Sequence, residues 1–391
     1  MTSRKVYFAV FGSGMGHATR SLEIARLLPR DEFDVRFSSS GQGLTHFRAS
    51  GEGGRTETSP PLDVEWTADG GFASNSVLPR FPLMFNKFLR QVAFEGRAID
   101  RFDPSLVISD SKLSVVLAAW SRSKPVVIML NQFKILFPPR FRSRAGLLFE
   151  GIAGDALGLM WSLGDRVLVT DLPPPYTIGE ENLTGMSMSK IIRFTGFTVP
   201  RVEVGEERLR KVKAELGLDS RPLIFCPVSG PDVTKGKFAE ILLKTGEELA
   251  RDHNFVVSMG IAGGSTEPRR LAGGGWLYDW CPVKDELFEL SGVLVARAGL
   301  STIAQCIDRL KPAVLVPIRN HPEQISNAEK FERLGLGVAI RSERLTPLNL
   351  VESVEKCATD QSYRKKLEVV CAVSRRYRGV ETCAEIIRTM T

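Results

Sequence analysis

The sequence predicts an α/β protein with two doubly wound domains, each a parallel sheet between layers of helices, that face a central cleft. The first observation is that short apolar runs rich in β-branched residues alternate with longer stretches of helical periodicity. The second is that this alternation begins afresh near the middle of the chain, whose 391 residues are too many for one ordinary core. In doubly wound folds, ligands bind outside the carboxyl ends of the strands.

The first domain is predicted to span residues 1–198. Its strands are six short apolar runs, namely Val6–Phe11, Phe33–Ser38, Leu106–Ser109, Val126–Leu130, Val167–Thr170 and Ile191–Thr195. Two segments, Phe81–Arg90 and Phe133–Arg144, interrupt the rhythm because they mix aromatic residues with lysine and arginine. Such segments suit adsorption to an anionic lipid surface, although a packed helix with a solvated basic loop has the same composition.

The second domain is predicted over residues 199–370, after a linker at Gly196–Pro200. Its strands are expected at Leu223–Val228, Phe255–Met259, Trp276–Tyr278, Val293–Ala296 and Ala313–Pro317. The pair Thr346-Pro347 is typical of a helix cap and first helical position. Residues 371–391 end in a helix predicted at Glu381–Met390, which we expect to pack back on the first domain.

The composition is that of an ordinary globular protein. Hydrophobic residues make up 43%, no apolar run approaches the ~20 residues that span a bilayer, and the N-terminus lacks the apolar core of a signal peptide. We therefore expect a cytoplasmic protein. The formal net charge of +7 favours an anionic partner such as a nucleotide, a nucleic acid or an acidic membrane, unless it is a basic surface without a specific role.

The cysteines and histidines do not have the spacing of metal ligands. The six cysteines include no CxxC pair, and the four histidines lack ligand spacing. We expect reduced, structural thiols, no metal and no cofactor.

The first predicted strand runs directly into the loop Gly12–His17, which reads G-S-G-M-G-H and precedes a helical pattern. Gly14 and Gly16 let the backbone pass close to a ligand at a helix N-terminus, where free N–H groups bind anions. A dinucleotide fingerprint needs G-x-G-x-x-G and a later acid, and a Walker loop needs Gly-Lys-Ser/Thr. The loop has neither pattern, so NAD binding is the less favoured interpretation.

His17 and Asp110 are the candidate catalytic pair. His17 ends the glycine loop, and Asp110 follows the strand Leu106–Ser109, so both side chains should reach the same edge of the sheet. A carboxylate behind an imidazole fixes its tautomer and supports a general base. The alternatives are that His17 caps its helix and that Asp110 caps the next one.

Three further segments carry a resemblance to a known family. These are Trp280–Lys284, which reads W-C-P-V-K, Arg297–Gln305, which reads R-A-G-L-S-T-I-A-Q, and His321–Ala328, which reads H-P-E-Q-I-S-N-A. Together with the glycine loop they resemble the donor-binding signature of GT-B glycosyltransferases that use UDP-sugars, of the MurG type and the UDP-glycosyltransferase type. The loop is most similar to that of uncharacterised archaeal relatives. The resemblance implies two Rossmann-like domains, with an acceptor-binding first domain and a donor-binding second domain.

The resemblance also assigns the donor-binding residues. Trp280 matches a tryptophan that stacks on uracil, although an isolated tryptophan also plugs a core. The diphosphate is assigned to two turns, one made of Gly299, Leu300, Ser301 and Thr302 and a second made of Ser229 and Gly230. A helix N-terminus in the first turn would bind this anion without a metal.

Arg297 is implied to form a charge-assisted bond with a phosphate. Glu323 and Gln324 match residues that bind sugar hydroxyls, although Glu323 could instead complement the helix dipole. Two positions depart from the family. Gln305 replaces the glutamate that binds ribose, which weakens the preference for uridine, and Val283 replaces a glutamine, so that only its backbone could contact the base.

The function expected from the resemblance is an inverting, metal-independent transfer of a sugar, such as N-acetylglucosamine or another hexose, from a UDP-sugar to a hydroxyl. No Asp-x-Asp triplet is present to hold a metal. The acceptor is lipid-linked, as for MurG-type enzymes, or a soluble small molecule, and no nucleic acid is expected. The protein would then be peripheral at the inner face of the membrane. A UDP-sugar epimerase of the same architecture and a non-catalytic nucleotide-sugar-binding partner are the competing functions.

The stacking role predicts that Trp280→Ala weakens UDP binding. The loss of one stacked base should cost about 1–3 kcal/mol of binding free energy. Calorimetry on the folded variant measures this loss directly. An unchanged affinity for UDP would rule out stacking of Trp280 on uracil.

Overall fold

The computed structural model describes residues 3–62, 67, 81–134, 136–137, 142–183, 192–261 and 263–391. The chain divides into two compact units. Unit 1 contains the described residues up to 62, from 81 to 200 and from 376 to 391, and unit 2 contains residue 67 and those from 201 to 375.

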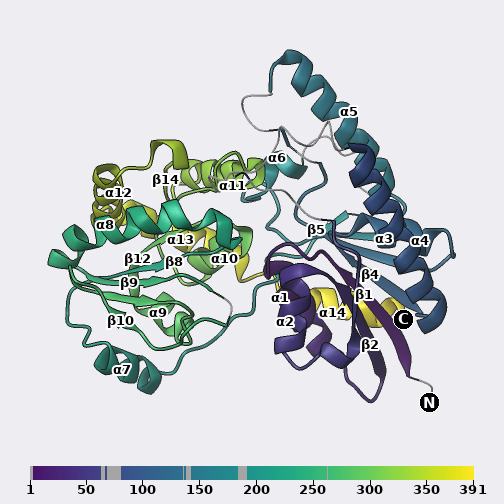
Figure 1. The fold of residues 1–391 in the computed structure, drawn as a ribbon, viewed down its shortest axis with the longest axis horizontal. Helices are drawn as coiled ribbons and strands as arrows, with labels where there is room; N and C mark the ends of the chain where they lie inside the picture. The colour runs from purple at the N-terminus through teal and green to yellow at the C-terminus, as the bar shows by residue number, and fades with distance from the viewer. Residues whose placement is uncertain are drawn as a thin grey trace. The chain divides into compact units, whose positions relative to one another are not determined.

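Unit 1 is built on a seven-stranded sheet in the order β3-β2-β1-β4-β5-β6-β7, and all of its neighbouring strands are parallel (Figure 1). The strands are β1 (Arg4–Val10), β2 (Phe33–Ser39), β3 (Thr56–Thr58), β4 (Leu106–Asp110), β5 (Val126–Leu130), β6 (Arg166–Val169) and β7 (Ile192–Phe194). The helices are α1 (Gly16–Arg26), α2 (Gly41–Ala49), α3 (Phe81–Phe102), α4 (Leu113–Trp120), α5 (Arg144–Trp161), α6 (Glu180–Leu183) and α14 (Gly379–Met390).

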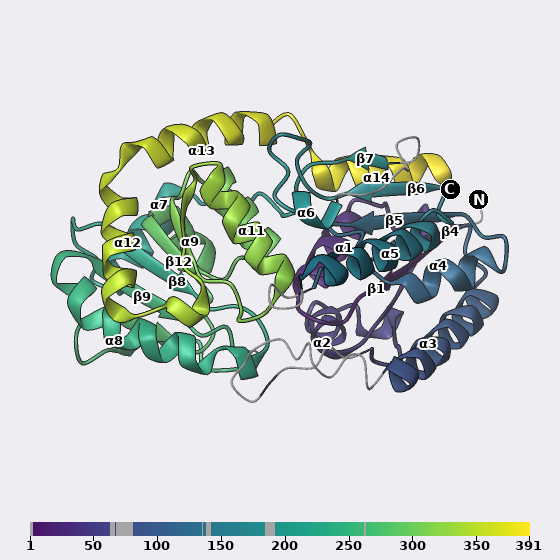
Figure 2. The same cartoon turned by 90° about the horizontal axis from the view of Figure 1, so that it is seen from above.

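The two faces of this sheet bury different helices, because successive side chains of a strand point to opposite faces. Val6 and Phe8 of β1 belong to a core cluster that includes side chains of α1 and α14, whereas Tyr7 belongs to a cluster that includes α3 and α4. The C-terminal helix α14 lies beside α1 (Figures 1 and 2) and contributes the buried Ile387 to the first cluster. The last helix of the chain is thus part of the core of unit 1.

Unit 2 also has a seven-stranded sheet, in the order β10-β11-β9-β8-β12-β13-β14, in which only β10 is antiparallel to its neighbour. The strands are β8 (Leu223–Pro227), β9 (Asn254–Ser258), β10 (Arg269–Arg270), β11 (Trp276–Tyr278), β12 (Ser291–Ala296), β13 (Ala313–Leu315) and β14 (Gly337–Ala339). The helices are α7 (Glu206–Glu215), α8 (Gly236–Asp252), α9 (Lys284–Leu290), α10 (Leu300–Asp308), α11 (Pro322–Arg333), α12 (Pro347–Thr359) and α13 (Gln361–Ser374).

The predicted α/β class with two Rossmann-like sheets is confirmed, and each predicted strand is present within two residues of its expected bounds. The sequence reading missed β3 and β10, which contain no apolar residue, and β14, which begins with a glycine. Thr346 caps α12 as predicted, because its side chain accepts from the backbone N–H of Asn349 at 3.3 Å.

Each sheet has one point where the strand order reverses direction. In unit 1 it lies between β1 and β4, and in unit 2 it lies between β8 and β12. The loops that leave such a pair of strands part to opposite faces of the sheet, which opens the crevice where doubly wound proteins bind ligands. Each unit therefore has its candidate site at a known edge.

Candidate functional site

The glycine loop of unit 1 leaves β1 at this reversal point. A side chain at Gly12 would place its Cβ 2.2 Å from Ser40 Oγ, so only glycine lets the loop pass the end of β2. Gly14 has a φ of +80°, which glycine adopts without strain. Helix α1 begins at Gly16, which places His17 in its first turn.

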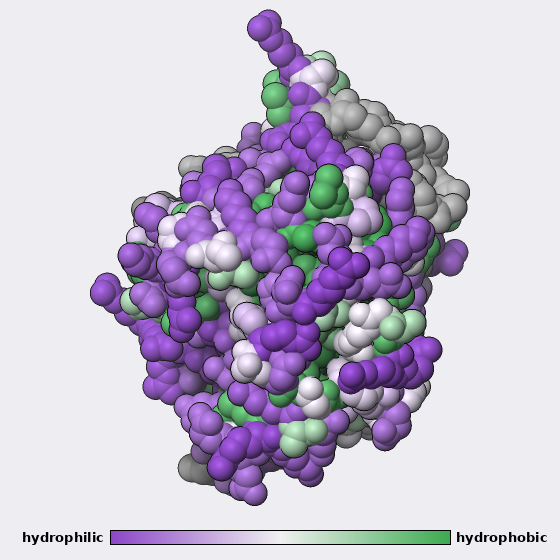
Figure 3. All heavy atoms as spheres, turned by 90° about the vertical axis from the view of Figure 1, so that its left-hand side faces the viewer, coloured by the Kyte–Doolittle hydropathy of each residue, from purple (hydrophilic) through white to green (hydrophobic). Residues whose placement is uncertain are grey.

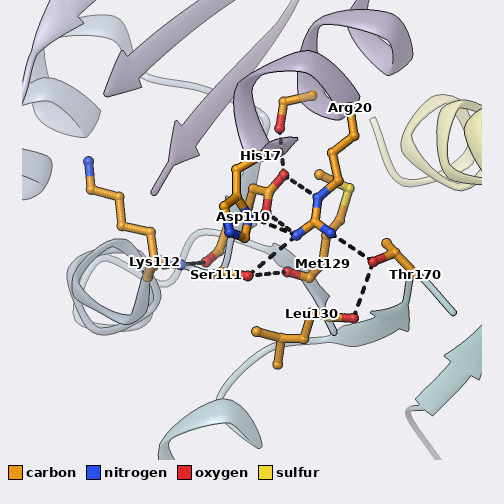
Figure 4. Close-up of polar contacts among 10 residues, drawn as sticks. His17, Arg20, Asp110, Ser111, Lys112, Met129, Leu130 and Thr170 are labelled. Carbon is orange, nitrogen blue, oxygen red and sulfur yellow. Dashed lines mark hydrogen bonds and ion pairs between the residues drawn. The ribbon is translucent and has the colours of Figure 1, made fainter. Parts of the chain in front are cut away.

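His17 and Asp110 meet at the carboxyl ends of β1 and β4. The Nδ1 atom of His17 lies 2.8 Å from Oδ1 of the fully buried Asp110 (Figure 4). Because a carboxylate only accepts hydrogen bonds, Nδ1 carries the proton in the neutral imidazole, and the lone pair of that form is on Nε2. The ring of Phe11 packs edge-on against the imidazole at 5.7 Å between centroids. The tautomer with its proton on Nδ1 is the one that a general base requires, because its Nε2 can accept a proton.

The two capping alternatives are wrong. Helix α1 has Met15 in its cap position without a side-chain bond, and His17 bonds to Asp110 instead of capping the helix. Helix α4 begins at Leu113 with Lys112 in the cap position, and the carboxylate of Asp110 contacts α1.

Arg20 is a member of this site that the sequence reading missed. Its Nε donates to Asp110 Oδ2 at 2.7 Å, one terminal nitrogen donates to Asp110 Oδ1, and the other donates to Thr170 at 2.8 Å (Figure 4). Ser21 adds a bond to Asp110 Oδ2 at 2.8 Å. The signal available in the sequence is spacing, because Arg20 lies one helical turn after His17 and shares its face of α1.

These contacts determine the charge state of Asp110. Burial alone would raise the pKa of its carboxyl group, but the charges and hydrogen bonds of Arg20 and His17 outweigh burial and hold the pKa well below its ordinary value. Asp110 is therefore ionised at neutral pH and accepts bonds from both neighbours.

The turn that follows Asp110 is held in place by a backbone hydrogen bond and by a buried ion pair. Ser111 has a φ of +54°, and its backbone N–H donates to the carbonyl oxygen of Met129 at 3.1 Å. The next residue, Lys112, is buried, with its Nζ 2.6 Å from Glu95 and 2.8 Å from Ser59 Oγ. This buried ion pair fixes the chain at Lys112, two residues after Asp110.

The candidate site of unit 2 begins where β12 ends. Gly299 stands in the cap position of α10, and no side chain caps the helix. A Cβ added to Gly299 would meet no atom of the described structure within 4 Å, so this side of the turn is open. Leu300 and Thr302 are partly exposed and Ser301 is exposed. The first backbone N–H groups of α10 are thus available to an anion.

The other assigned donor residues follow parallel strands of the same sheet. Ser229 and Gly230 come after β8, and Gly230 has a φ of +107°. Trp280 comes after β11, is partly exposed, and donates its backbone N–H to Ser265 at 3.0 Å. Val283 is partly exposed in the cap position of α9.

Helix α11 completes this edge. Glu323 and Gln324 lie in its first turn and are partly exposed, as is Gln305 on α10. The Oε1 atom of Gln324 accepts the backbone N–H of Ile318 at 3.0 Å, which fixes the side chain on the loop before the helix. Asn327, which the sequence reading did not single out, donates to the carbonyl oxygen of Ala298 at 3.2 Å and so ties α11 to the turn before α10.

The structure does not present Arg297 as the resemblance implies. The side chain is 4% exposed, and its terminal nitrogens donate to Thr234 O at 2.7 Å, Val316 O at 3.1 Å and Pro317 O at 3.3 Å. Its Nε has no acceptor among the described residues and is itself buried. Burial lowers the pKa of Arg297 to about 10, so the group is still charged at neutral pH. Arg297 therefore joins the loops after β8 and β13.

The described residues hold no cluster of three or more histidine, cysteine or acidic side chains that could bind a metal ion. None of their helices is both long enough and apolar enough to cross a membrane.

Comparisons with known proteins fit this geometry. Residues 239–380 match the model of the glycosyltransferase family 28 C-terminal domain. An uncharacterized glycosyltransferase of Methanopyrus kandleri is 24% identical over 335 residues, which cover 85% of this chain and 91% of the relative. The Bacillus thuringiensis UDP-N-acetylglucosamine--N-acetylmuramyl-(pentapeptide) pyrophosphoryl-undecaprenol N-acetylglucosamine transferase 2 is 23% identical, with 98% of each chain covered.

Solved structures agree in fold. The glycotransferase of kitacinnamycin has a TM-score of 0.69 at 18% identity and is covered over 100% of both chains. The calicheamicin glycosyltransferase CalG4 has a TM-score of 0.68 at 16% identity, with 100% of this chain and 98% of that chain covered.

The position of Arg297 predicts a loss of stability without any ligand. In Arg297→Met, three carbonyl oxygens lose their buried donor, which should lower the free energy of unfolding by at least about 2 kcal/mol. Urea unfolding of the ligand-free protein measures this. The exposed Arg344→Met in the same unit is the control and should stay within about 0.5 kcal/mol of wild type. Unchanged stability together with weaker UDP binding would instead restore the phosphate contact.

Proposed function

Because the chain is a MurG-like glycosyltransferase of the GT-B fold, we propose that it transfers a sugar from a UDP-sugar to a hydroxyl group, with inversion and without a metal ion. The observation that carries this proposal is the pair of His17 and Asp110, joined at 2.8 Å beside the glycine loop. In the neutral imidazole, the proton on Nδ1 points to this carboxylate and the lone pair is on Nε2, which is the group that an acceptor hydroxyl needs.

The proposed step conserves atoms and charge. Nε2 of His17 takes the proton of the acceptor hydroxyl while its oxygen forms a bond to the anomeric carbon. The bond between that carbon and the donor phosphate breaks, and UDP leaves with the electron pair. Attack from the side opposite the phosphate inverts the anomeric centre.

The donor half of the proposal rests on unit 2. The uncapped N-terminus of α10 offers backbone N–H groups and the positive end of the helix dipole to the leaving diphosphate, so no metal is required for its charge. The partly exposed Trp280 is available to stack on the uracil ring. Glu323 and Gln324 would bind hydroxyl groups of the sugar. At the ribose, Gln305 would offer an uncharged amide in place of a carboxylate.

For the acceptor we propose a lipid-linked molecule. The Bacillus thuringiensis relative acts, by its name, on a pyrophosphoryl-undecaprenol compound. On α5, Leu148, Ile152 and Leu159 are between 57% and 72% exposed, and their spacing of four and seven residues puts them on one stripe of the helix. The face turned to the viewer in Figure 3, on the side of α7 and α8, is by contrast mostly hydrophilic.

This stripe replaces part of the segment that the sequence reading assigned to lipid. Phe133 is buried in the core of unit 1, and Lys134 and Arg142 pair with the buried Glu150 at 3.9 and 3.2 Å. Those two charges face the protein, and Arg140 and Phe141 lie outside the described residues. Arg144, at the start of α5, is exposed. We therefore assign membrane contact to α5.

Two competing functions make different predictions. An epimerase acts on the nucleotide sugar alone and would convert UDP-N-acetylglucosamine without an acceptor. A non-catalytic binding protein would not depend on His17. Incubation with the donor alone, followed by chromatography, separates the epimerase from the transferase.

His17→Ala decides whether this site is catalytic. Turnover should fall about 10²- to 10⁴-fold, the usual contribution of a positioned base, while the affinity for UDP changes little because unit 2 holds it. Asp110→Asn should impair the same step, and the double variant should be far less than additive because the two residues act together. Turnover close to wild type in folded His17→Ala would end the catalytic assignment.

The membrane assignment predicts sedimentation with vesicles that contain anionic lipid. Each leucine or isoleucine that inserts contributes about 1.5–3 kcal/mol, so the triple variant L148S/I152S/L159S should lose about a thousandfold or more in partitioning. The matched control is L348S/V369S, which changes two exposed apolar side chains of unit 2. Equal sedimentation of wild type and both variants would contradict the role of α5.

A further inference from the structure

We propose that Arg20 is a positioning residue for the transfer reaction, which aligns the carboxylate of Asp110 and balances its charge so that His17 meets the acceptor as an unprotonated base. This inference rests on the proposed function of His17. It adds a residue that acts on His17 through Asp110 and through its own positive charge.

The geometry shows why an arginine suits this position. Nε and one terminal nitrogen of Arg20 bind the two different oxygens of Asp110, so the planar guanidinium fixes the plane of the carboxylate. Oδ1 is then held where Nδ1 of His17 reaches it at 2.8 Å. The remaining terminal nitrogen is anchored on Thr170, directly after β6. A lysine could supply the charge but not this fork.

Arg20 also approaches the imidazole directly. One terminal nitrogen lies 3.0 Å from Nδ1 of His17. Since Nδ1 donates its proton to Asp110, this approach is a contact between two donors, and its consequence is electrostatic. A positive charge this close to the ring opposes protonation of Nε2.

The charged groups around His17 therefore nearly cancel. Asp110 faces the ring from β4 with one negative charge, and Arg20 faces it from α1 with one positive charge. From α14, Cys383 lies near both of them, but burial raises the pKa of its thiol to about 12 and keeps it neutral.

The histidine of the neighbouring helix α2, His46, adds no charge. His46 contacts Thr19 of α1 at 3.3 Å, and burial, followed by the charge of Arg26, lowers the pKa of His46. His46 is therefore neutral at pH 7. Without Arg20, the buried carboxylate of Asp110 would act on His17 uncompensated and would favour the imidazolium form, which cannot accept a proton.

The test is a titration of His17 by NMR, which needs neither donor nor acceptor. The chain has four histidines, so the ring signals can be assigned by substituting each in turn. In Arg20→Gln the titration midpoint of His17 should move to higher pH by about one unit or more relative to wild type. The exposed Arg26→Gln, on the same helix, is the matched control and should leave this midpoint in place.

Arg20→Lys separates charge from alignment. It should keep the midpoint near that of wild type while lowering turnover, because lysine retains the charge and loses the fork. In activity assays, the acidic limb of the kcat/KM profile should move to higher pH in Arg20→Gln and not in Arg26→Gln. A purely structural role for Arg20 would lower the melting temperature without moving this limb.

An unchanged midpoint in folded Arg20→Gln overturns the proposal. If that variant does not fold, Asp110→Asn is compared with the double variant R20Q/D110N, in which loss of the positive charge should again raise the midpoint. Normal turnover in His17→Ala would overturn the catalytic role of His17 and leave the NMR comparison standing, so the two failures are distinguishable.

Discussion

The buried charge of Asp110 is the constraint on which the candidate site of unit 1 depends. An ionised carboxylate with no exposed surface is costly unless it is paired and hydrogen-bonded. Arg20, Ser21 and His17 supply those bonds, and all three come from one helix, α1. Arg20 also donates a hydrogen bond to Thr170, which follows β6. The same side chain therefore links α1 to the end of a strand that lies beyond β4 and β5 in the sheet. The same set of hydrogen bonds therefore compensates the charge of Asp110 and orients the imidazole of His17.

The loops at the candidate site of unit 2 are held in a different way. Its loops also part at a reversal of strand order, and a buried arginine again holds them, but Arg297 binds backbone carbonyl groups where Arg20 binds a carboxylate. The difference fits the proposed chemistry. A general base needs a paired negative charge behind it, whereas an anion-binding turn needs its backbone held still without a carboxylate nearby. Asn327 serves the same end by fixing the carbonyl before Gly299.

The sequence predicted the strands well because buried parallel strands are continuous apolar runs. It brought His17 and Asp110 together because each follows a strand and the strand ends share one edge. Arg20 was missed although it lies one helical turn after His17, because the partners that give it a role lie 90 and 150 residues away in the sequence. Arg297 shows the converse limit. A resemblance identifies the type of residue but not the direction of its side chain, which packing of the neighbouring loops decides.

The two candidate half-sites differ in how much of the chemistry their own residues specify. In the proposed function, unit 2 offers mainly backbone groups and one aromatic ring, which suit any nucleoside diphosphate with a stackable base, so the choice of sugar falls to Glu323 and Gln324. Unit 1 offers one imidazole whose free nitrogen can deprotonate any hydroxyl. Neither group selects an acceptor. In the proposed function, selection must therefore come from surfaces that bring the acceptor to His17, and we propose the exposed apolar stripe of α5 as such a surface for a molecule carried in a membrane.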